Sequence, residues 1–112
     1  TVAGTLEATK IKTGRTWQSV TGSRSLSTTE TNSSGSEIEI SVNIEITSDN
    51  TDAQVDLQVD GRTREKSVRL VSGSSGDRLT VSSTIPAGSN YTASPVFNST
   101  NLSLKRWEEY RP

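Results

Sequence analysis

Residues 37–46 read Glu-Ile-Glu-Ile-Ser-Val-Asn-Ile-Glu-Ile, and this stretch decides the fold class. Large β-branched apolar residues occupy every second position: Ile38, Ile40, Val42, Ile44 and Ile46. Successive side chains leave a β-strand on opposite faces, so a period of two predicts one long strand with a buried face and a polar face. An α-helix would scatter these residues around its circumference.

Shorter alternating segments, separated by turn-forming residues, continue on both sides of this strand. Asp60-Gly61 predicts a two-residue type I′ hairpin, because that turn needs positive φ at both central residues. The strand after it is rich in Lys and Arg, which suits the edge of a sheet. We expect strands at residues 15–20, 24–31, 37–46, 54–60, 63–71, 79–85, 91–94 and 102–110. About eight strands without a helical period predict an all-β fold, a single antiparallel β-sandwich.

The length of 112 residues suits one domain with a modest core. Only 29% of the residues are hydrophobic and 4% aromatic, and roughly a third are Ser or Thr, so we expect a thin core beneath polar outer faces. The sandwich domain should span residues 15–112. Residues 1–14 are interpreted as a connector or a short N-terminal strand. Because the sequence starts at Thr1 and contains no Met, we expect either a processed product or a piece of a longer polypeptide, and we favour the second.

Composition argues against several classes of function. The formal net charge of −1 provides no basic surface for nucleic acid. The chain has neither Cys nor His, which excludes Ser-His-Asp and Cys-His catalysis and the usual zinc sites. No apolar run approaches the roughly 18 residues of a membrane span. We therefore expect no enzymatic activity, no cofactor, no nucleic-acid partner and no membrane insertion.

Two groups of residues with side-chain oxygens are candidate sites. Asp49, Asn50, Asp52 and Asp56 offer oxygen ligands of the kind that calcium takes, but their spacing matches no complete calcium loop, and a solvated turn is the better interpretation. Glu37, Glu39 and Glu45 share one face of the long strand. Paired carboxylates hydrolyse glycosides at suitable separations, but a solvated or subunit-facing surface, with cross-strand partners among Arg62, Arg64, Lys66 and Arg69, explains them better.

Three aromatic residues, Trp17, Trp107 and Tyr110, are candidate platforms for sugar rings. A chain with only five aromatic residues has few large side chains to spare. We therefore expect them to pack in the core or at a subunit interface.

Alternation of strand direction predicts where the loops lie. If each strand reverses the one before, residues 21–23, 48–53, 72–77 and 95–101 gather at one end. The termini and the turns at 32–36, 60–61 and 86–89 then occupy the other end. Loops on a rigid sandwich commonly carry recognition residues.

The order of several short motifs resembles a known family. Trp17-Gln18-Ser19-Val20-Thr21, Arg24-Ser25-Leu26 and Thr31-Asn32-Ser33-Ser34-Gly35 precede the long strand. The Val59-Asp60-Gly61 hairpin, Ile85-Pro86-Ala87-Gly88-Ser89-Asn90-Tyr91 and Leu104-Lys105-Arg106-Trp107-Glu108-Glu109 follow it. Together, over residues 15–110, they resemble the C-terminal domain of bacteriophage tail fibres. The sequence departs from that pattern at Ser27, where Gly is common, and in the charged strand at residues 62–69.

The resemblance implies a β-sandwich at the end of a fibre, a homotrimer that contacts other virion tail proteins and the host surface. It implies structural roles for Trp17, Asn32, Gly35, Gly61, Pro86, Gly88, Tyr91 and Trp107, and it transfers no receptor site.

Taken together, these observations predict a virion attachment domain that binds a host surface glycan or protein by multivalent adhesion. The candidate receptor-binding residues are Asp49, Asn50, Asp52, Ser74, Ser75, Asp77, Asn98, Thr100 and Asn101. The alternatives are a capsid decoration protein of β-sandwich fold and a carbohydrate-binding module.

Overall fold

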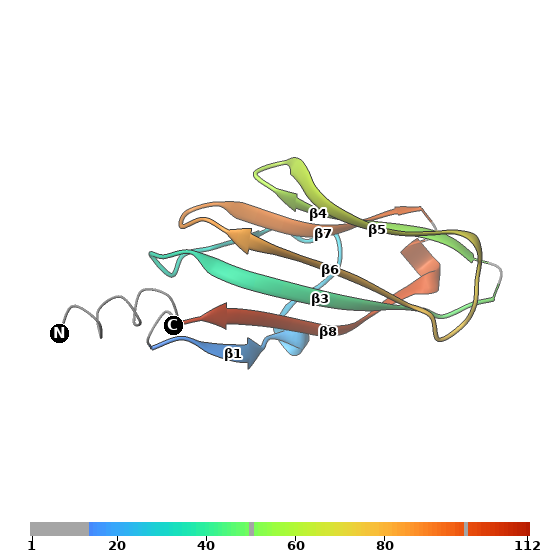
Figure 1. The fold of residues 1–112 in the computed structure, drawn as a ribbon, viewed down its shortest axis with the longest axis horizontal. Coiled ribbons are helices and arrows are strands. Elements are labelled where there is room, and N and C mark those ends of the chain that lie inside the picture. Colours follow the sequence, from blue (N-terminus) through green and yellow to red (C-terminus); the bar gives the residue numbers. More distant parts are fainter. Residues whose placement is uncertain (1–13, 50, 98) are drawn as a thin grey trace, which may run out of the picture.

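A computed structural model of the chain describes residues 14–49, 51–97 and 99–112, except the side chains of residues 67–73, 97 and 99. The described residues form eight strands and two short 3-10 helices, η1 (Thr21–Ser23) and η2 (Ser99–Asn101) (Figure 1). The strands are β1 (Thr16–Ser19), β2 (Glu30–Thr31), β3 (Ile38–Ile46), β4 (Thr51–Val59), β5 (Arg62–Gly73), β6 (Arg78–Ile85), β7 (Asn90–Phe97) and β8 (Leu102–Arg111). The prediction of an all-β sandwich is confirmed.

Within the described residues, the strands make two four-stranded antiparallel sheets. Sheet A has the order β1-β8-β3-β6, and sheet B has the order β2-β7-β4-β5. The chain crosses between the sheets after every strand except β4, which forms a hairpin with β5. Eight antiparallel strands connected in this way across two sheets form a jelly roll, the two-Greek-key version of the β-sandwich.

The core lies between the sheets, and β3 runs through the middle of sheet A. Its five alternating apolar side chains are at most 1% exposed. They face the inward residues of β4, which include Val55, Leu57 and Val59. The largest buried side chains, Trp107 of β8 and Tyr91 of β7, pack together with ring centroids 6.3 Å apart. The period of two in residues 37–46 thus builds the apolar contact between the two sheets.

Two expected strand boundaries were wrong. The segment 24–31 is a strand only at Glu30–Thr31, because Ser27 has a left-handed backbone with φ of 65° that interrupts the extended conformation. Strand β7 continues to Phe97, although residues 95–101 were expected to be a loop. Pro95 is tolerated because the β4–β7 register shifts between Gln54 and Val55, and proline is accommodated at such irregularities.

The hairpin prediction is confirmed. Asp60 and Gly61 have φ of 52° and 80°, as a type I′ turn requires. The charged strand that follows, β5, is an edge strand of sheet B, also as expected.

The two ends of the sandwich differ in content (Figure 1). The C-terminus, the start of β1 and the turns β2–β3, β4–β5 and β6–β7 lie at one end, which we call the terminus end. The loops β3–β4, β5–β6 and β7–β8 lie at the other, which we call the loop end. Residues 21–23 were expected there too, but β1 is only four residues long, so η1 lies beside the middle of β8.

Candidate functional site

The three connections at the loop end are joined by backbone hydrogen bonds. The N–H of Ile46 donates to Asp77 O and the N–H of Gly76 donates to Ile46 O, both at 2.8 Å. The N–H of Thr47 donates to Asn101 O at 2.9 Å. Connections β5–β6 and β7–β8 are therefore both held against the end of β3. The loop end forms one surface instead of three separate loops.

Two of the predicted receptor-binding residues shape this surface through their carboxylates. Asp49 accepts a hydrogen bond from the N–H of Ser75 at 2.8 Å, which links β3–β4 to β5–β6. Asp77 accepts one from the N–H of Ser74 at 2.8 Å and closes its own turn. Backbone N–H groups thus occupy one oxygen of each carboxylate, and these bonds hold the described parts of the loops in place.

The structure brings most of the predicted residues to one end but does not make them a single cluster. Asn101 accepts a hydrogen bond from Ser48 Oγ at 3.4 Å, while Asp52 and Thr100 are exposed. Asn50 and Asn98 lie outside the described residues. Among the residues that the structure describes, no three acidic side chains come together as a metal site.

The acidic face of β3 finds different partners from those expected. Glu45 lies 3.3 Å from Arg78 Nη2 of β6 and 3.4 Å from Lys105 Nζ of β8. The expected partners lie on β5, which belongs to the opposite sheet. That pairing was wrong because residues 62–69 follow β4 in sheet B and have no place beside β3.

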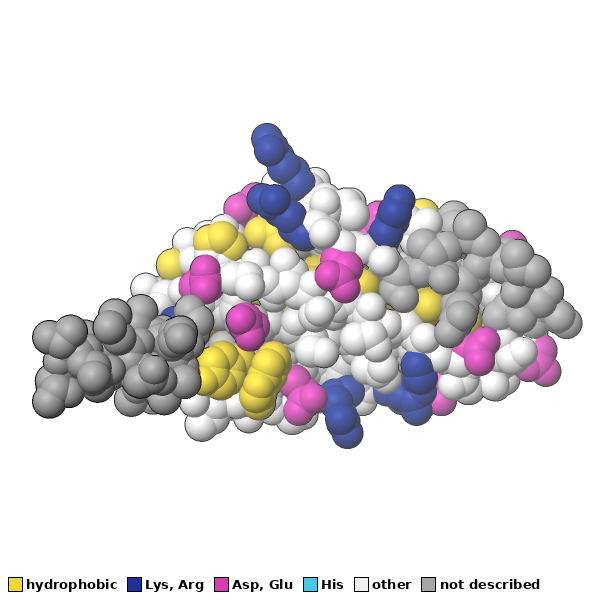
Figure 2. Space-filling view, viewed as in Figure 1, with side chains coloured by type: hydrophobic (Ala, Val, Ile, Leu, Met, Phe, Trp, Pro, Cys, Tyr) yellow, Lys and Arg dark blue, Asp and Glu magenta, His cyan; other side chains and the backbone are white. Residues whose placement is uncertain are grey.

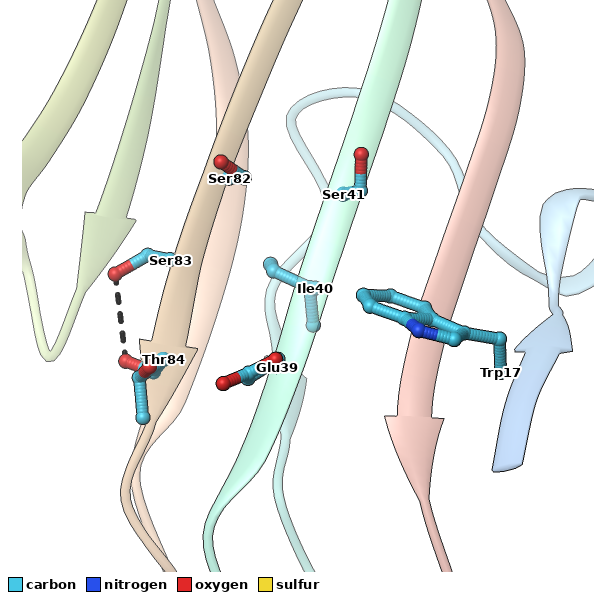
Figure 3. Close-up of a pocket in the computed structure, with 7 residues that line it drawn as sticks. All are labelled: Trp17, Glu39, Ile40, Ser41, Ser82, Ser83 and Thr84. Atoms are coloured by element: carbon cyan, nitrogen blue, oxygen red, sulfur yellow. Dashed lines mark hydrogen bonds between the residues drawn. The ribbon is translucent and has the colours of Figure 1, made fainter. Parts of the chain in front are cut away.

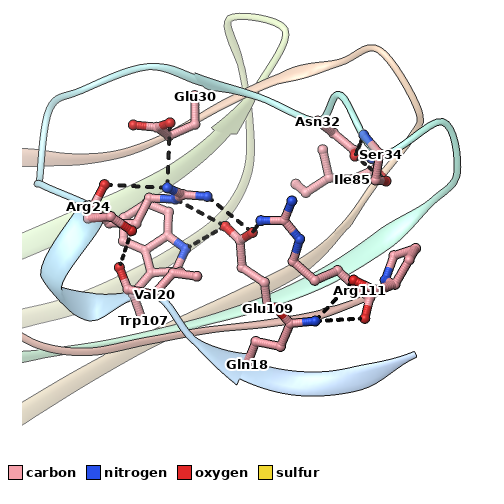
Figure 4. Close-up of polar contacts among 12 residues, drawn as sticks. Gln18, Val20, Arg24, Glu30, Asn32, Ser34, Ile85, Trp107, Glu109 and Arg111 are labelled. Carbon is pink, nitrogen blue, oxygen red and sulfur yellow. Dashed lines mark hydrogen bonds and ion pairs between the residues drawn. The ribbon is translucent and has the colours of Figure 1, made fainter. Parts of the chain in front are cut away.

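One acidic residue, Glu109, is completely buried between the sheets (Figure 4). Its Oε2 accepts hydrogen bonds from Tyr91 OH at 2.8 Å, Trp107 Nε1 at 3.1 Å and Arg24 Nε at 3.2 Å. Its Oε1 accepts from Arg111 Nη1 at 3.0 Å and Arg24 Nη2 at 3.2 Å. A buried carboxylate is tolerated when it is paired and fully hydrogen-bonded, and five donors meet that condition here.

This buried cluster connects the two sheets and the irregular segment between β1 and β2. Burial, together with the hydrogen bond to Glu109 and the charge of Glu109, raises the pKa of Tyr91 to about 12 against the opposing effect of Arg24. Desolvation disfavours the charge of Arg24, but the hydrogen bond and charge of Glu109 outweigh it, so the pKa of Arg24 is raised. Arg24 also lies 3.7 Å from Glu30 of β2. The cluster is therefore a structural tie between the sheets and the segment that precedes β2.

Asn32 makes a second tie at the terminus end. Its buried Nδ2 lies 2.8–3.1 Å from the carbonyl oxygens of Ser36, Ile85 and Pro86, and its Oδ1 accepts a hydrogen bond from Ser34 Oγ at 2.7 Å. One side chain thus joins the β2–β3 turn to the end of β6. This explains why Asn follows β2 at this point.

The candidate aromatic residues divide into two kinds. Trp107 is buried, as expected, and it lies within the Glu109 cluster. Trp17 is 52% exposed and stacks on Tyr110, with ring centroids 5.4 Å apart on the outer face of sheet A. Trp17 is therefore not a core residue.

The sequence did not reveal the role of Glu109, the outward hydroxyl residues beside Trp17, or the role of Asn32 as a tie. A signal for Glu109 was present, because it is two residues from Trp107 and must share its face of β8. The outward positions Ser41, Ser82 and Thr84 gave no such signal, because Ser and Thr are common along the whole chain.

No protein-family model matches this sequence, and no curated protein is significantly similar to it. Within the described part of the chain, no helix has the length and apolar character needed to cross a membrane. The motifs that suggested tail fibres contribute the contacts described above: Arg24, Asn32, Tyr91, Trp107 and Glu109 form the two structural ties. These residues of the motifs therefore have a structural explanation in this fold.

Proposed function

We propose that this chain is the end domain of a bacteriophage tail fibre, or of a related tail-tip protein, and that it attaches the virion to the host surface. The observation that supports this most is the division of the molecule into two ends. The C-terminus and the start of β1 lie opposite the joined loops at residues 47–49, 74–77 and 99–101. A domain tethered at its terminus end would present its loop end to a receptor.

In this proposal the domain acts as a homotrimer beside other tail proteins, and its ligand is a host surface glycan or protein. The ordered loops lower the entropic cost of each contact. Three copies per fibre then convert weak single contacts into strong attachment, with a gain of about 10²–10⁴ in avidity. No covalent chemistry is involved.

The test uses the whole chain with a fluorescent label, either alone or fused at its N-terminus to a trimeric coiled coil. Binding to a panel of bacterial strains is measured by flow cytometry. We expect the trimer to bind at least one strain about 100-fold more tightly than the single chain. Ser75→Arg should abolish this binding, because Ser75 is exposed at the loop end and only its backbone N–H makes a described contact.

The matched control is Ala87→Arg, which adds the same side chain to an exposed position at the terminus end. It should leave binding unchanged. Equal effects of the two substitutions, or no binding to any strain, would count against the proposal. A stable monomer that binds only soluble glycans would favour a carbohydrate-binding module, and binding to empty capsids would favour a decoration protein.

A further inference from the structure

The outer face of sheet A contains a shallow depression of about 380 Å³ (Figure 3). Register places Thr84, Glu39, Tyr110 and Trp17 side by side across β6, β3, β8 and β1. The next row along the strands begins with Ser82 and Ser41. The indole of Trp17 extends across β8 toward β3 (Figure 3). The hydroxyl and carboxylate side chains that line the depression come from β3 and β6, beyond the indole.

Trp17 is unusual among the few aromatic residues of the chain. Its side chain is half exposed, whereas Trp107 and Tyr91 are buried. The indole packs against the ring of Tyr110 at an interplanar angle of 42°, and this contact limits the positions that the indole can take. Figure 2 shows hydrophobic atoms over β1 and β8 on a face that is otherwise mostly polar. The ring contributes nothing to the core and presents a flat apolar surface to solvent.

A pyranose ring has complementary chemistry. Its C–H groups form an apolar face that packs on an aromatic ring, while its hydroxyl groups project around the rim and both donate and accept hydrogen bonds. Ser41, Ser82 and Thr84 can donate and accept in the same way, and the carboxylate of Glu39 accepts. We propose that this depression is a saccharide-binding site, with Trp17 as the stacking platform and Glu39 as the hydroxyl acceptor.

A second depression of about 520 Å³ continues the site along the same face, and Ser41 lines both. Its other lining residues are Asn43, Arg78, Thr80, Lys105, Arg106 and Glu108. From Glu39 to Glu45 the face extends about 20 Å at 3.3 Å per residue, which suits a chain of several sugar rings. The ligand is thus an oligosaccharide.

The charge of the second depression indicates which oligosaccharide. Arg78 and Lys105 share the single carboxylate of Glu45, and Arg106 lies 3.9 Å from Glu108. Three cations with two carboxylates leave a positive charge at this part of the face, where Figure 2 shows basic side chains. We expect the bound glycan to carry a carboxylate or phosphate group there. This site is on the strands, away from the loop end, and it does not depend on the proposed attachment role.

The test is a printed array of neutral, carboxylated and phosphorylated oligosaccharides, followed by titration calorimetry of the whole chain with the strongest binder. Trp17→Ala should weaken binding at least about ten-fold, and Trp17→Phe should keep most of it. Arg106→Ala should reduce the preference for the charged glycan over its neutral analogue. Because Trp17 is the exposed tryptophan, binding should also shift the emission of the wild-type protein.

The matched control is Val96→Ala, which removes another exposed apolar side chain from β7 in the other sheet. It should bind like the wild type, and urea unfolding should show that all variants are folded. Binding of no saccharide on the array would overturn the proposal, as would a Trp17→Ala variant that binds like the wild type. A change of oligomeric state in Trp17→Ala without saccharide binding would instead assign this face to contact between copies of the chain.

Discussion

Glu109→Gln is expected to lower the free energy of unfolding by about 3–5 kcal/mol, the usual result of removing one partner from a buried ion pair. The contacts of Glu109 explain this size. Three donors reach Oε2 and two reach Oε1. Glutamine has an NH2 group in place of one of these oxygens, so at least two of the five donors would lose their acceptor and face another donor. Each buried polar group left without its partner costs about 1–3 kcal/mol. Arg24 would also lose its buried counter-charge.

The measurement is urea unfolding followed by circular dichroism and by tryptophan fluorescence. The matched control is Glu108→Gln, one residue away and on the opposite face of β8, where the described ion pair to Arg106 is 3.9 Å long. This control should change the free energy of unfolding by less than about 0.5 kcal/mol, as is usual for exposed pairs. The m-value should stay constant in both variants.

Tyr91→Phe completes a double-mutant cycle with Glu109→Gln. Tyr91 donates the shortest of the five hydrogen bonds to Glu109, so a coupling free energy of about 1–2 kcal/mol is expected. If the free energies of unfolding of Glu109→Gln and Glu108→Gln differ by less than about 1 kcal/mol, the buried cluster does not hold the sheets together and the reasoning fails.

Three further results are expected. Asn32→Ala should destabilise by about 2–3 kcal/mol in thermal or urea unfolding because it leaves buried carbonyl oxygens without a donor, whereas Ser33→Ala, exposed beside it, should have little effect. Ser27→Gly should stabilise by about 0.5–1 kcal/mol, since glycine adopts a φ of 65° without strain; a loss of stability would contradict the assignment of strain there. The pKa of Tyr91 rises from 10.0 to about 12 on folding, so its stabilising contribution is complete below pH 10 and is lost by pH 12. Between pH 9 and 11 the free energy of unfolding of the wild type, measured with urea, should therefore fall by about 1.4 kcal/mol more than that of Tyr91→Phe. Parallel pH profiles of the two proteins would refute this.

Local patterns in the sequence were sufficient to predict the central strand and the hairpin of this fold. The alternation in residues 37–46 gave the central strand, because burial on one face determines every second residue. Asp60-Gly61 gave the hairpin, because few residues accept positive φ at two successive positions. Both features depend only on neighbours in the chain.

Pairings between distant segments could not be predicted in the same way. Glu45 meets Arg78 and Lys105 because β6 and β8 flank β3 in sheet A, and sheet order is not encoded in local alternation. The short β2 depends on one left-handed residue, Ser27, that composition does not reveal. The depression beside Trp17 needs the register of four strands, so its polar residues could be found only in three dimensions.

The position of β8 also has a mechanical consequence. This strand lies between β1 and β3, and it runs from the loop end to the terminus end. If the domain is tethered at its terminus end and bound at its loop end, as proposed above, tension acts along the strands. Ladder hydrogen bonds are perpendicular to the strands, so such a pull loads the bonds between β3 and β8 in shear and all at once. The domain should resist a lengthwise pull much better than a sideways pull, which would peel the same ladder open one bond at a time.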